Sequence, residues 1–193
     1  VNCCRNHFAD HMEHDIFVVS VDNLREMITV KLPNPHEVGA DRLVNAIAAW
    51  NVKKCKQVVI DFGTAITFDC VAENCEYLGG SILPGIAISL EALANKTAKL
   101  PHIDVSEAPQ NIIGRTTVQA MQSGILYGYG SMIDGLVQGI RKEMIDKVEE
   151  DFRVVATGGM AQLIAPYSSC IDTIDTGLTL RGLQLIYNTL VIR

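Results

Sequence analysis

The chain has 193 residues, of which 48% are hydrophobic and 20% are charged, so it can bury a globular core. Its formal net charge of −6 argues against a nucleic-acid partner, because binding to phosphates requires a basic face. No window is typical of a signal peptide or a membrane span, and the six cysteines form no CxxC pair. We therefore expect no membrane association, reduced thiols and a cytoplasmic location.

The beginning of the chain is polar and does not start with methionine. Residues 1–4 read as the end of a preceding segment, which predicts that an N-terminal part is absent from this sequence. Residues 6–14 predict a short helix that carries His7, His11 and His14 on one face. Without an HExxH motif or an evident fourth ligand, we expect this face to be exposed rather than metal-binding.

A strand, a connector and a helix are predicted next. The apolar, β-branched run 16–21 predicts a strand. The two prolines of 32–36 predict an extended connector, since the residue before a proline is driven away from helical geometry. A helix is expected from about Ala40, with Leu43 and Ile47 on its apolar face.

The middle of the chain predicts three sequential strands and then two helices. The strands are expected at 57–61, 64–71 and 76–83, with a turn at 72–74 between the last two. The helices are expected at 86–100 and 116–148.

The longer of these helices contains pairs of glycines four residues apart, namely Gly124 with Gly128 and Gly135 with Gly139. Each glycine in a helix interior costs about 1 kcal/mol relative to alanine. Such small residues let another helix approach closely, and this packing would offset the cost. We therefore expect a homodimer that forms through this helix.

The last third of the chain alternates strands and helices. The predicted elements are a strand at 153–156, a turn at 157–159, a helix, a strand at 171–174 and a final helix with Leu180, Leu183, Ile186 and Leu190 at helical spacing. Three meandering strands followed by this alternation predict an α/β fold of the ribonuclease-H-like type. We expect residues 57–193 to form one complete C-terminal half-domain, and 1–56 to be the remainder of an N-terminal half-domain that carries a substrate-binding segment.

The sharpest local motif is Asp-Phe-Gly-Thr-Ala at 61–65, where a carboxylate ends a buried strand. Gly63 allows close approach of the backbone to a ligand, and Thr64 offers a hydroxyl and an amide to a phosphate. By itself this motif also fits an ordinary hairpin turn. It does not indicate a protein kinase, because the chain has no HRD loop, VAIK lysine or Gly-rich loop, and a Walker A sequence is also absent.

A second motif, Glu-Val-Gly-Ala-Asp-Arg at 37–42, lies where the connector enters a helix. Asp41 falls in the first helical turn, where the helix dipole favours the anionic form that a general base needs. Arg42 can hold a carboxylate or a phosphate with its planar guanidinium. The alternative is simple helix capping with a surface arginine.

Two further turns precede helices. Thr157-Gly158-Gly159 leaves backbone room for a nucleotide base or ribose, although the start of an ordinary helix explains it equally well. The segment 114–117 contains Thr116 and Thr117, for which a helix cap is the simple explanation.

Taken together, these motifs resemble the type III pantothenate kinases of bacteria, which have an actin-like fold. The matching segments, in order, are 37–42, 61–65, 80–85, Thr117 with 121–124, 157–159 and 178–183. The resemblance extends from about residue 33 to the end. The family's N-terminal Asp-x-Gly-Asn-Thr phosphate loop has no match in 1–30, so the ATP site in this chain is expected to be incomplete.

The resemblance implies ATP-dependent phosphorylation of pantothenate to 4'-phosphopantothenate, the first step of coenzyme A biosynthesis. It implies Mg²⁺ and a monovalent cation, K⁺ or NH₄⁺, as cofactors. The implied substrate contacts are Gly39, Ala40, Asp41, Arg42 and, across a dimer interface, Thr117. Asp41 would be the catalytic base and Asp61 the monovalent-cation ligand, and the ATP contacts would be Thr64 together with Gly63, Gly158 and Gly159.

Two other functions are compatible with the same fold. One is a related kinase that acts on another small hydroxy acid or sugar. The other is a non-catalytic regulatory binding protein, because a fold does not determine a function. Retention of the Asp41–Arg42 pair favours the kinase, since a scaffold has no need for a base beside an anion-binding group.

Overall fold

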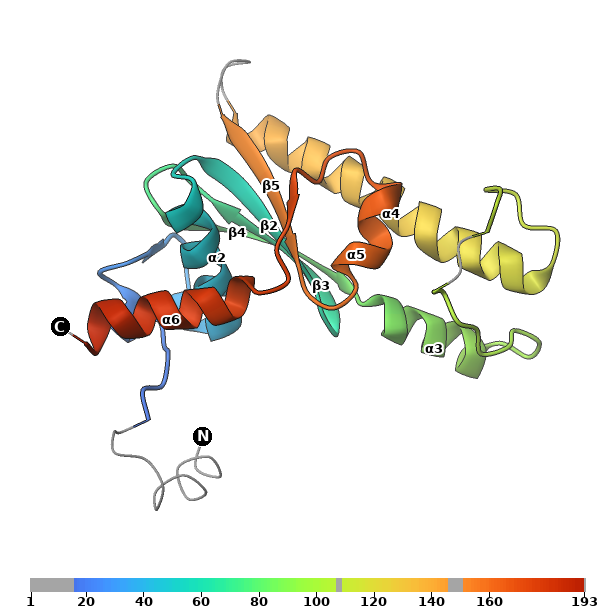
Figure 1. The fold of residues 1–193 in the computed structure, drawn as a ribbon, viewed down its shortest axis with the longest axis horizontal. Helices are drawn as coiled ribbons and strands as arrows, with labels where there is room; N and C mark the ends of the chain where they lie inside the picture. Colours follow the sequence, from blue (N-terminus) through green and yellow to red (C-terminus); the bar gives the residue numbers. More distant parts are fainter. Residues whose placement is uncertain (1–15, 107–108, 146–150, 193) are drawn as a thin grey trace.

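The computed structural model describes residues 16–106, 109–145 and 151–192 (Figure 1). The predicted helix at 6–14, with its three histidines, lies outside these ranges. No helix within them is long and apolar enough to cross a membrane. The same ranges contain no cluster of three or more histidine, cysteine, aspartate or glutamate side chains placed to hold a metal ion.

A six-stranded sheet in the order β1-β4-β3-β2-β5-β6 forms the centre of the molecule. Its strands are β1 (Thr29–Val30), β2 (Lys56–Phe62), β3 (Ala65–Val71), β4 (Glu76–Pro84), β5 (Phe152–Thr157) and β6 (Thr173–Ile174). β2, β3 and β4 form the predicted antiparallel meander, and β5 and β6 then add in parallel beside β2. These five strands have the order of a ribonuclease-H-like half-domain, which confirms the predicted fold class.

The helices lie in two layers (Figure 1). They are α2 (Ala40–Val52), α3 (Ile86–Lys96), α4 (Thr117–Met144), α5 (Ala161–Ile164) and α6 (Leu178–Leu190). α2 and α6 cover one face of the sheet, whereas α4 and α5 pack on the other. α3 and the first half of α4 extend beyond the sheet, away from α2.

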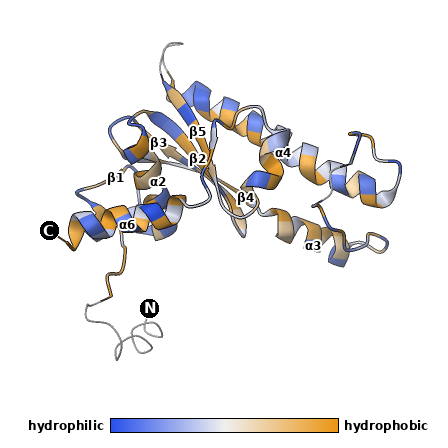
Figure 2. Cartoon of the chain, in the orientation of Figure 1, coloured by the Kyte–Doolittle hydropathy of each residue, from blue (hydrophilic) through white to orange (hydrophobic). Residues whose placement is uncertain are grey.

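Burial on both faces explains the composition of β2, which is orange along the centre of Figure 2. Val58 and Ile60 face the core under α4, and Val59 packs with Ala48 and Ala49 of α2 on the opposite face. A strand covered by helices on both sides reads as a continuous apolar run rather than an alternating one. The sequence of β2 therefore identifies it as the central strand.

The contact between α2 and α6 is close because Gly182 faces α2. A β-carbon at Gly182 would lie 2.6 Å from Cγ1 of Val44, so a larger residue does not fit. The predicted final helix is confirmed, but the four leucine and isoleucine residues at helical spacing do not mark its buried face along the whole length. Leu178, Gly182 and Ile186 are buried, whereas Leu180 is 74% exposed.

The N-terminal part of the described chain differs from the expectation. Residues 16–21 do not form the predicted strand, because no other strand pairs with them. The chain instead forms a 3-10 turn at Asp22–Leu24 and then the short strand β1, which pairs in parallel with β4. Leu24 and Ile28 share a hydrophobic cluster with Tyr77, so this segment packs against the meander.

Candidate active site

The carboxyl ends of β2 and β5 lie side by side and form the centre of the site. Asp61 on β2 is in register with Thr157 on the parallel strand β5. The turns that follow these strands, at 63–64 and 158–159, therefore meet at one edge of the sheet. This edge is where α/β proteins bind their ligands.

The two turns are held together by close backbone approaches. Gly158 has a φ of 90°, and a β-carbon there would lie 2.5 Å from Oδ1 of Asp61. Only glycine adopts this conformation without strain and leaves this space. On the other side, the amide of Gly85 donates a hydrogen bond of 3.1 Å to the carbonyl of Thr64. Thr64 itself is exposed, so its hydroxyl is open to a ligand.

Asp41 lies at the start of α2, as predicted, and its side chain is exposed. The backbone amide of Arg42 donates to Oδ1 of Asp41 at 3.0 Å. An anionic carboxylate in the first turn is favoured by the helix dipole. Asn45, one turn further along α2, donates a hydrogen bond to Asp61, so the start of α2 lies near the end of β2.

Asp61 is half-buried and has one hydrogen-bond partner among the described residues. The side-chain amide of Asn45 donates to Oδ2 of Asp61 at 3.0 Å, while Oδ1 faces Gly158. Burial raises the pKa of Asp61; the hydrogen bond from Asn45 opposes this, and the charges of Asp41 and Asp69 add to it. A half-buried carboxylate near other carboxylates is stabilised by a bound cation, and without one its protonated form is favoured.

The sequence predicted that Arg42 can hold a carboxylate or a phosphate of a ligand, but part of its guanidinium already binds a carboxylate of this chain. Its Nε donates to Oδ1 of Asp69 at 2.6 Å, and its guanidinium carbon lies 5.7 Å from the ring centroid of Tyr77. Asp69 was missed by the sequence reasoning. The available signal was a carboxylate in the otherwise apolar strand β3, since acidic residues are rarely buried unless they are paired.

Asn45 was missed as well, because it lies inside a helix whose apolar face was assigned to Leu43 and Ile47. Asn45 is 1% exposed, and its carbonyl oxygen accepts a hydrogen bond from Thr179 of α6 at 2.7 Å. The structure thus brings together Asp41, Arg42, Asp61 and the turns at 63–64 and 158–159, and it adds Asn45 and Asp69 to the predicted group.

Thr117 is not brought to this group within the chain. It is the first residue of α4, exposed, at the end of the helix that points away from α2 (Figure 1). The neighbouring Thr116 caps the helix, since its hydroxyl oxygen accepts the amide of Gln119 at 3.2 Å. The capping interpretation of the segment 114–117 is therefore confirmed for Thr116.

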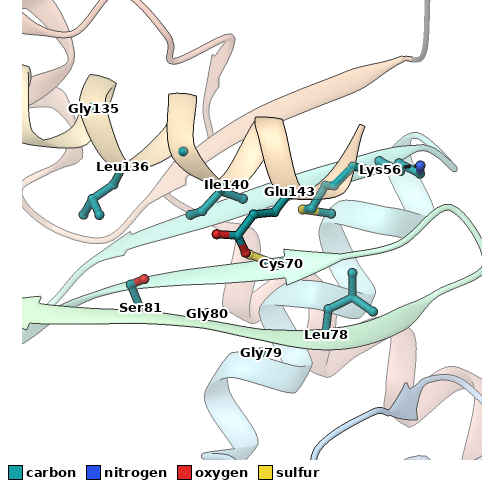
Figure 3. A pocket seen from close by; sticks show the side chains of 12 residues that line it. Lys56, Cys70, Leu78, Gly79, Gly80, Ser81, Gly135, Leu136, Ile140 and Glu143 are labelled. Carbon is teal, nitrogen blue, oxygen red and sulfur yellow. Dashed lines mark hydrogen bonds between the residues drawn. The ribbon is translucent and has the colours of Figure 1, made fainter. Parts of the chain in front are cut away.

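A pocket of about 540 Å³ lies on the opposite face of the sheet, between α4 and β4 (Figure 3). Gly79 and Gly80 form its lower side, and Glu143 reaches from α4 toward Cys70. Burial, together with the charge of Asp69, raises the pKa of Cys70 to about 12, so this residue is a neutral thiol and not a nucleophile. Cys70 and Asp69 are consecutive in β3 and point to opposite faces.

A ribonuclease-H-like sheet with carboxylates and glycine turns at the ends of its strands has the architecture of an actin-like ATPase or kinase half-domain. A sequence profile of the type III pantothenate kinases matches residues 2–139. The type III pantothenate kinase of Desulfotalea psychrophila is 55% identical over 190 residues, which cover 98% of this chain and 71% of that protein. The chain belongs to the type III pantothenate kinase family.

A second relative supports this assignment, and a solved structure shares the fold. The type III pantothenate kinase of Desulforapulum autotrophicum is 46% identical over 85% of this chain, and the match spans 61% of that protein. A solved structure from Campylobacter jejuni, described as a Baf family transcriptional activator, aligns with a TM-score of 0.56 and 23% identity. That alignment covers 86% of this chain and 71% of the other, and it supports the fold alone.

Proposed function

We propose that this protein transfers the terminal phosphoryl group of ATP to pantothenate, giving 4'-phosphopantothenate in the first step of coenzyme A biosynthesis. The observation that carries the proposal is the position of Asp41, an exposed carboxylate in the first turn of α2, the helix whose Asn45 holds Asp61 at the end of β2. Membership of the family supplies the identity of the acceptor. No observation favours a regulatory binding protein or a different acceptor.

Asp41 would act as the general base. Its Oδ1 is held by the amide of Arg42, while Oδ2 accepts no hydrogen bond from the described residues. This oxygen can orient the primary hydroxyl of the acceptor and accept its proton as the phosphoryl group arrives. The transition state of phosphoryl transfer is loose, so positioning and charge neutralisation provide most of the catalysis. Gly39, Ala40 and Arg42 would complete the acceptor site.

The two turns would contact ATP. Thr64 and Gly63 present an exposed hydroxyl and backbone at the end of β2, and Gly158 and Gly159 do so at the end of β5. No β-carbon at Gly159 would meet another atom within 4 Å, which leaves room for a nucleotide. ATP would bring Mg²⁺ with its phosphates.

Asp61 fits a monovalent-cation ligand, K⁺ or NH₄⁺. Its Oδ1 accepts no hydrogen bond from the described residues and lies beside the backbone of Gly158. Oxygen donors of this kind suit hard cations. A cation held there would offset the repulsion among the carboxylates of Asp41, Asp61 and Asp69 and the phosphates of ATP.

The glycine face of α4 supports a homodimer. A β-carbon at Gly124, Gly128, Gly135 or Gly139 would meet nothing within 4 Å, so no described residue of this chain packs on them. A second copy packed there could bring its Thr117 to the acceptor site.

The two half-domains would divide at 56/57, as the sequence predicted. The location would be cytoplasmic, which suits the free thiols of Cys55, Cys70, Cys75 and Cys170.

The test is an assay of the purified full-length protein for ATP-dependent phosphorylation of pantothenate, with the product identified by mass spectrometry. Parallel reactions contain other small hydroxy acids and sugars as acceptors. Formation of 4'-phosphopantothenate as the preferred product is expected. A clear preference for another acceptor, or no transfer to any of them, would refute the proposal.

A further inference from the structure

Asp69 is a buried carboxylate that accepts hydrogen bonds from three side chains. Nε of Arg42 donates to its Oδ1 at 2.6 Å, and the hydroxyl of Tyr77 donates to the same atom at 2.7 Å. The hydroxyl of Thr67 donates to Oδ2 at 2.9 Å. The side chain of Asp69 is only 1% exposed, so these bonds lie in a medium where charge-assisted contacts are strong.

Tyr77 holds both members of this ion pair. Its hydroxyl bonds to Asp69, and its ring lies under the guanidinium of Arg42 at 5.7 Å. Tyr77 is fully buried, and burial and the charge of Asp69 raise its pKa, so the hydroxyl stays protonated and remains a donor. The guanidinium therefore cannot rotate away from Asp69 without losing its contacts on one edge and one face.

The other edge of the guanidinium carries no hydrogen bond within the described residues. A β-carbon at Gly80 would lie 3.4 Å from Nη2 of Arg42, so the glycine keeps the neighbouring space open. The side chain of Arg42 is 17% exposed, so it is not fully sealed from solvent, and its two Nη groups have no hydrogen-bond partner among the described residues. Two parallel N–H groups of this kind match the geometry of a carboxylate.

Within this group an anionic part of a ligand can bind only at Arg42. Asp41, Asp61 and Asp69 contribute three carboxylates, and Arg42 is the cation among these residues. An acceptor that carries a carboxylate would be repelled by Asp41 and Asp61 unless a cation received its acid group. Arg42 lies next to Asp41 in α2, so it can do this while Asp41 holds the hydroxyl.

We propose that Asp69 and Tyr77 are positioning residues that orient the guanidinium of Arg42 toward the carboxylate of the acceptor. They thereby make the site selective for an acid over its neutral counterpart. This inference rests on the proposed function, since it takes pantothenate as the acceptor. The acceptor site would thus depend on Asp69 of β3 and Tyr77 of β4, which lie outside the segment 37–42.

The experiment compares two ligands by titration calorimetry on the full-length protein. One is pantothenate, and the other is its neutral counterpart in which a primary alcohol replaces the carboxylate. We expect Asp69→Asn to weaken pantothenate binding by about tenfold or more, the size of one lost charge-assisted contact. The affinity for the neutral alcohol should change by less than about threefold, so the selectivity ratio falls.

Tyr77→Phe keeps the Arg42–Asp69 ion pair and removes one of its hydrogen bonds, so it tests the inference even if Asp69→Asn does not fold. It should lower the same selectivity ratio by a smaller factor, about twofold to fivefold. Cys70→Ala is the matched control, because Cys70 follows Asp69 in β3 but faces the opposite pocket. It should leave the ratio unchanged.

The results separate the two proposals. A wild-type protein that binds neither ligand would refute the proposed function, and the inference with it. A wild-type protein that prefers pantothenate, with a ratio that neither Asp69→Asn nor Tyr77→Phe alters, would overturn the inference alone. Equal losses for both ligands would also overturn it, because a merely structural role for Asp69 predicts that outcome.

Discussion

The hydroxyl of Thr179 on α6 donates a hydrogen bond of 2.7 Å to Oδ1 of Asn45 on α2. The amide of Asn45 donates in turn to Oδ2 of Asp61, at 3.0 Å. Thr179 is 134 residues from Asn45 in the sequence, so the last helix of the chain supports a carboxylate at the centre of the site. Asn45 has both an acceptor and a donor, and the orientation of its amide follows from these two partners.

Replacement of Asn45 by alanine should destabilise the fold. It would leave Oδ2 of Asp61 and the hydroxyl of Thr179 without their partner in a buried place, which typically costs about 1–3 kcal/mol. Chemical denaturation of the wild type and the variant measures the difference in the free energy of unfolding. Asn51→Ala, at an exposed position of the same helix, is the control and should change it by less than about 0.5 kcal/mol. Equal stability of Asn45→Ala and the wild type would contradict a stabilising role for the hydrogen bonds of Asn45 with Thr179 and Asp61.

Asp41→Asn should abolish turnover without loss of stability. The amide has the same shape but cannot accept the proton of the acceptor hydroxyl, and general-base assistance contributes about 10²–10⁴-fold. Asp41 is exposed, so the melting temperature should stay near that of the wild type. Steady-state assays with pantothenate check the activity. More than about a tenth of wild-type activity would show that another group is the base.

The full-length protein should require a monovalent cation, and Asp61→Ala should remove that requirement together with most of the activity. A binding measurement supports the assay: KCl should raise the melting temperature of the wild type more than tetramethylammonium chloride at equal ionic strength, because a ligand that binds the folded state stabilises it. In Asp61→Ala the two salts should act alike. Identical behaviour of the wild type in both salts would contradict a cation site at Asp61.

The sequence predicted those parts of the fold and site that depend on local pattern. The meander β2-β3-β4, the helix that begins at Ala40, and the places of Asp41 in its first turn and of Asp61 near the end of β2 agree with the structure. β1 could not be predicted, because two residues show no periodicity and become a strand only by pairing with β4. The apolar run 16–21 failed for the opposite reason, since it has the composition of a strand but no neighbour to pair with.

The buried polar residues of the site could not be predicted because their burial depends on contacts between elements that are distant in the sequence. Asn45 lies on a second face of α2 that is buried only because Gly182 lets α6 approach. Asp69 is stable inside the sheet only because Arg42, Thr67 and Tyr77 meet there from three elements. No single segment of sequence shows that α6 packs on α2 or that three side chains meet at Asp69. The sequence did show a carboxylate within the largely apolar strand β3, and this was the one available signal.

Gly128→Leu should disturb the homodimer while leaving the monomer folded. Gly128 is exposed on α4, and leucine has a good helix propensity, so the change should not harm an isolated chain. Across a close helix contact the same side chain would collide with the partner. Light scattering at micromolar concentration should show dissociation, and Gly128→Ala, which adds one methyl group, should have a smaller effect. A monomeric wild type would refute the interface.

Asp134 should make the stability of the protein depend on pH below about 4. This residue of α4 holds the loop after the 3-10 turn Ala165–Tyr167: its carboxylate accepts the hydroxyls of Ser168 and Ser169, both at 2.6 Å, and the amide of Ser169 at 3.0 Å. Burial alone would raise its pKa, but the bonds from Ser168 and Ser169 outweigh burial and lower the pKa to about 2. The folded state therefore favours the ionised form more than the unfolded chain does.

The direction of the pH dependence follows from the difference between the pKa of Asp134 in the folded and the unfolded chain. An aspartate in an unfolded chain has a pKa of about 3.9, so the contribution of Asp134 is fully present above that pH and is lost as the pH falls toward about 2. With allowance for solvent screening we expect about 1–2 kcal/mol at neutral pH. Asp134→Asn should show this loss at pH 7 in urea denaturation, and its deficit relative to the wild type should shrink as the pH is lowered from about 4 to about 2.5. Asp151→Asn, which removes an exposed ion pair with Lys53, is the control and should cost less than about 1 kcal/mol. If the deficit of Asp134→Asn were the same at every pH, the bonds to Ser168 and Ser169 would not depend on the charge of the carboxylate, and the lowered pKa would be wrong.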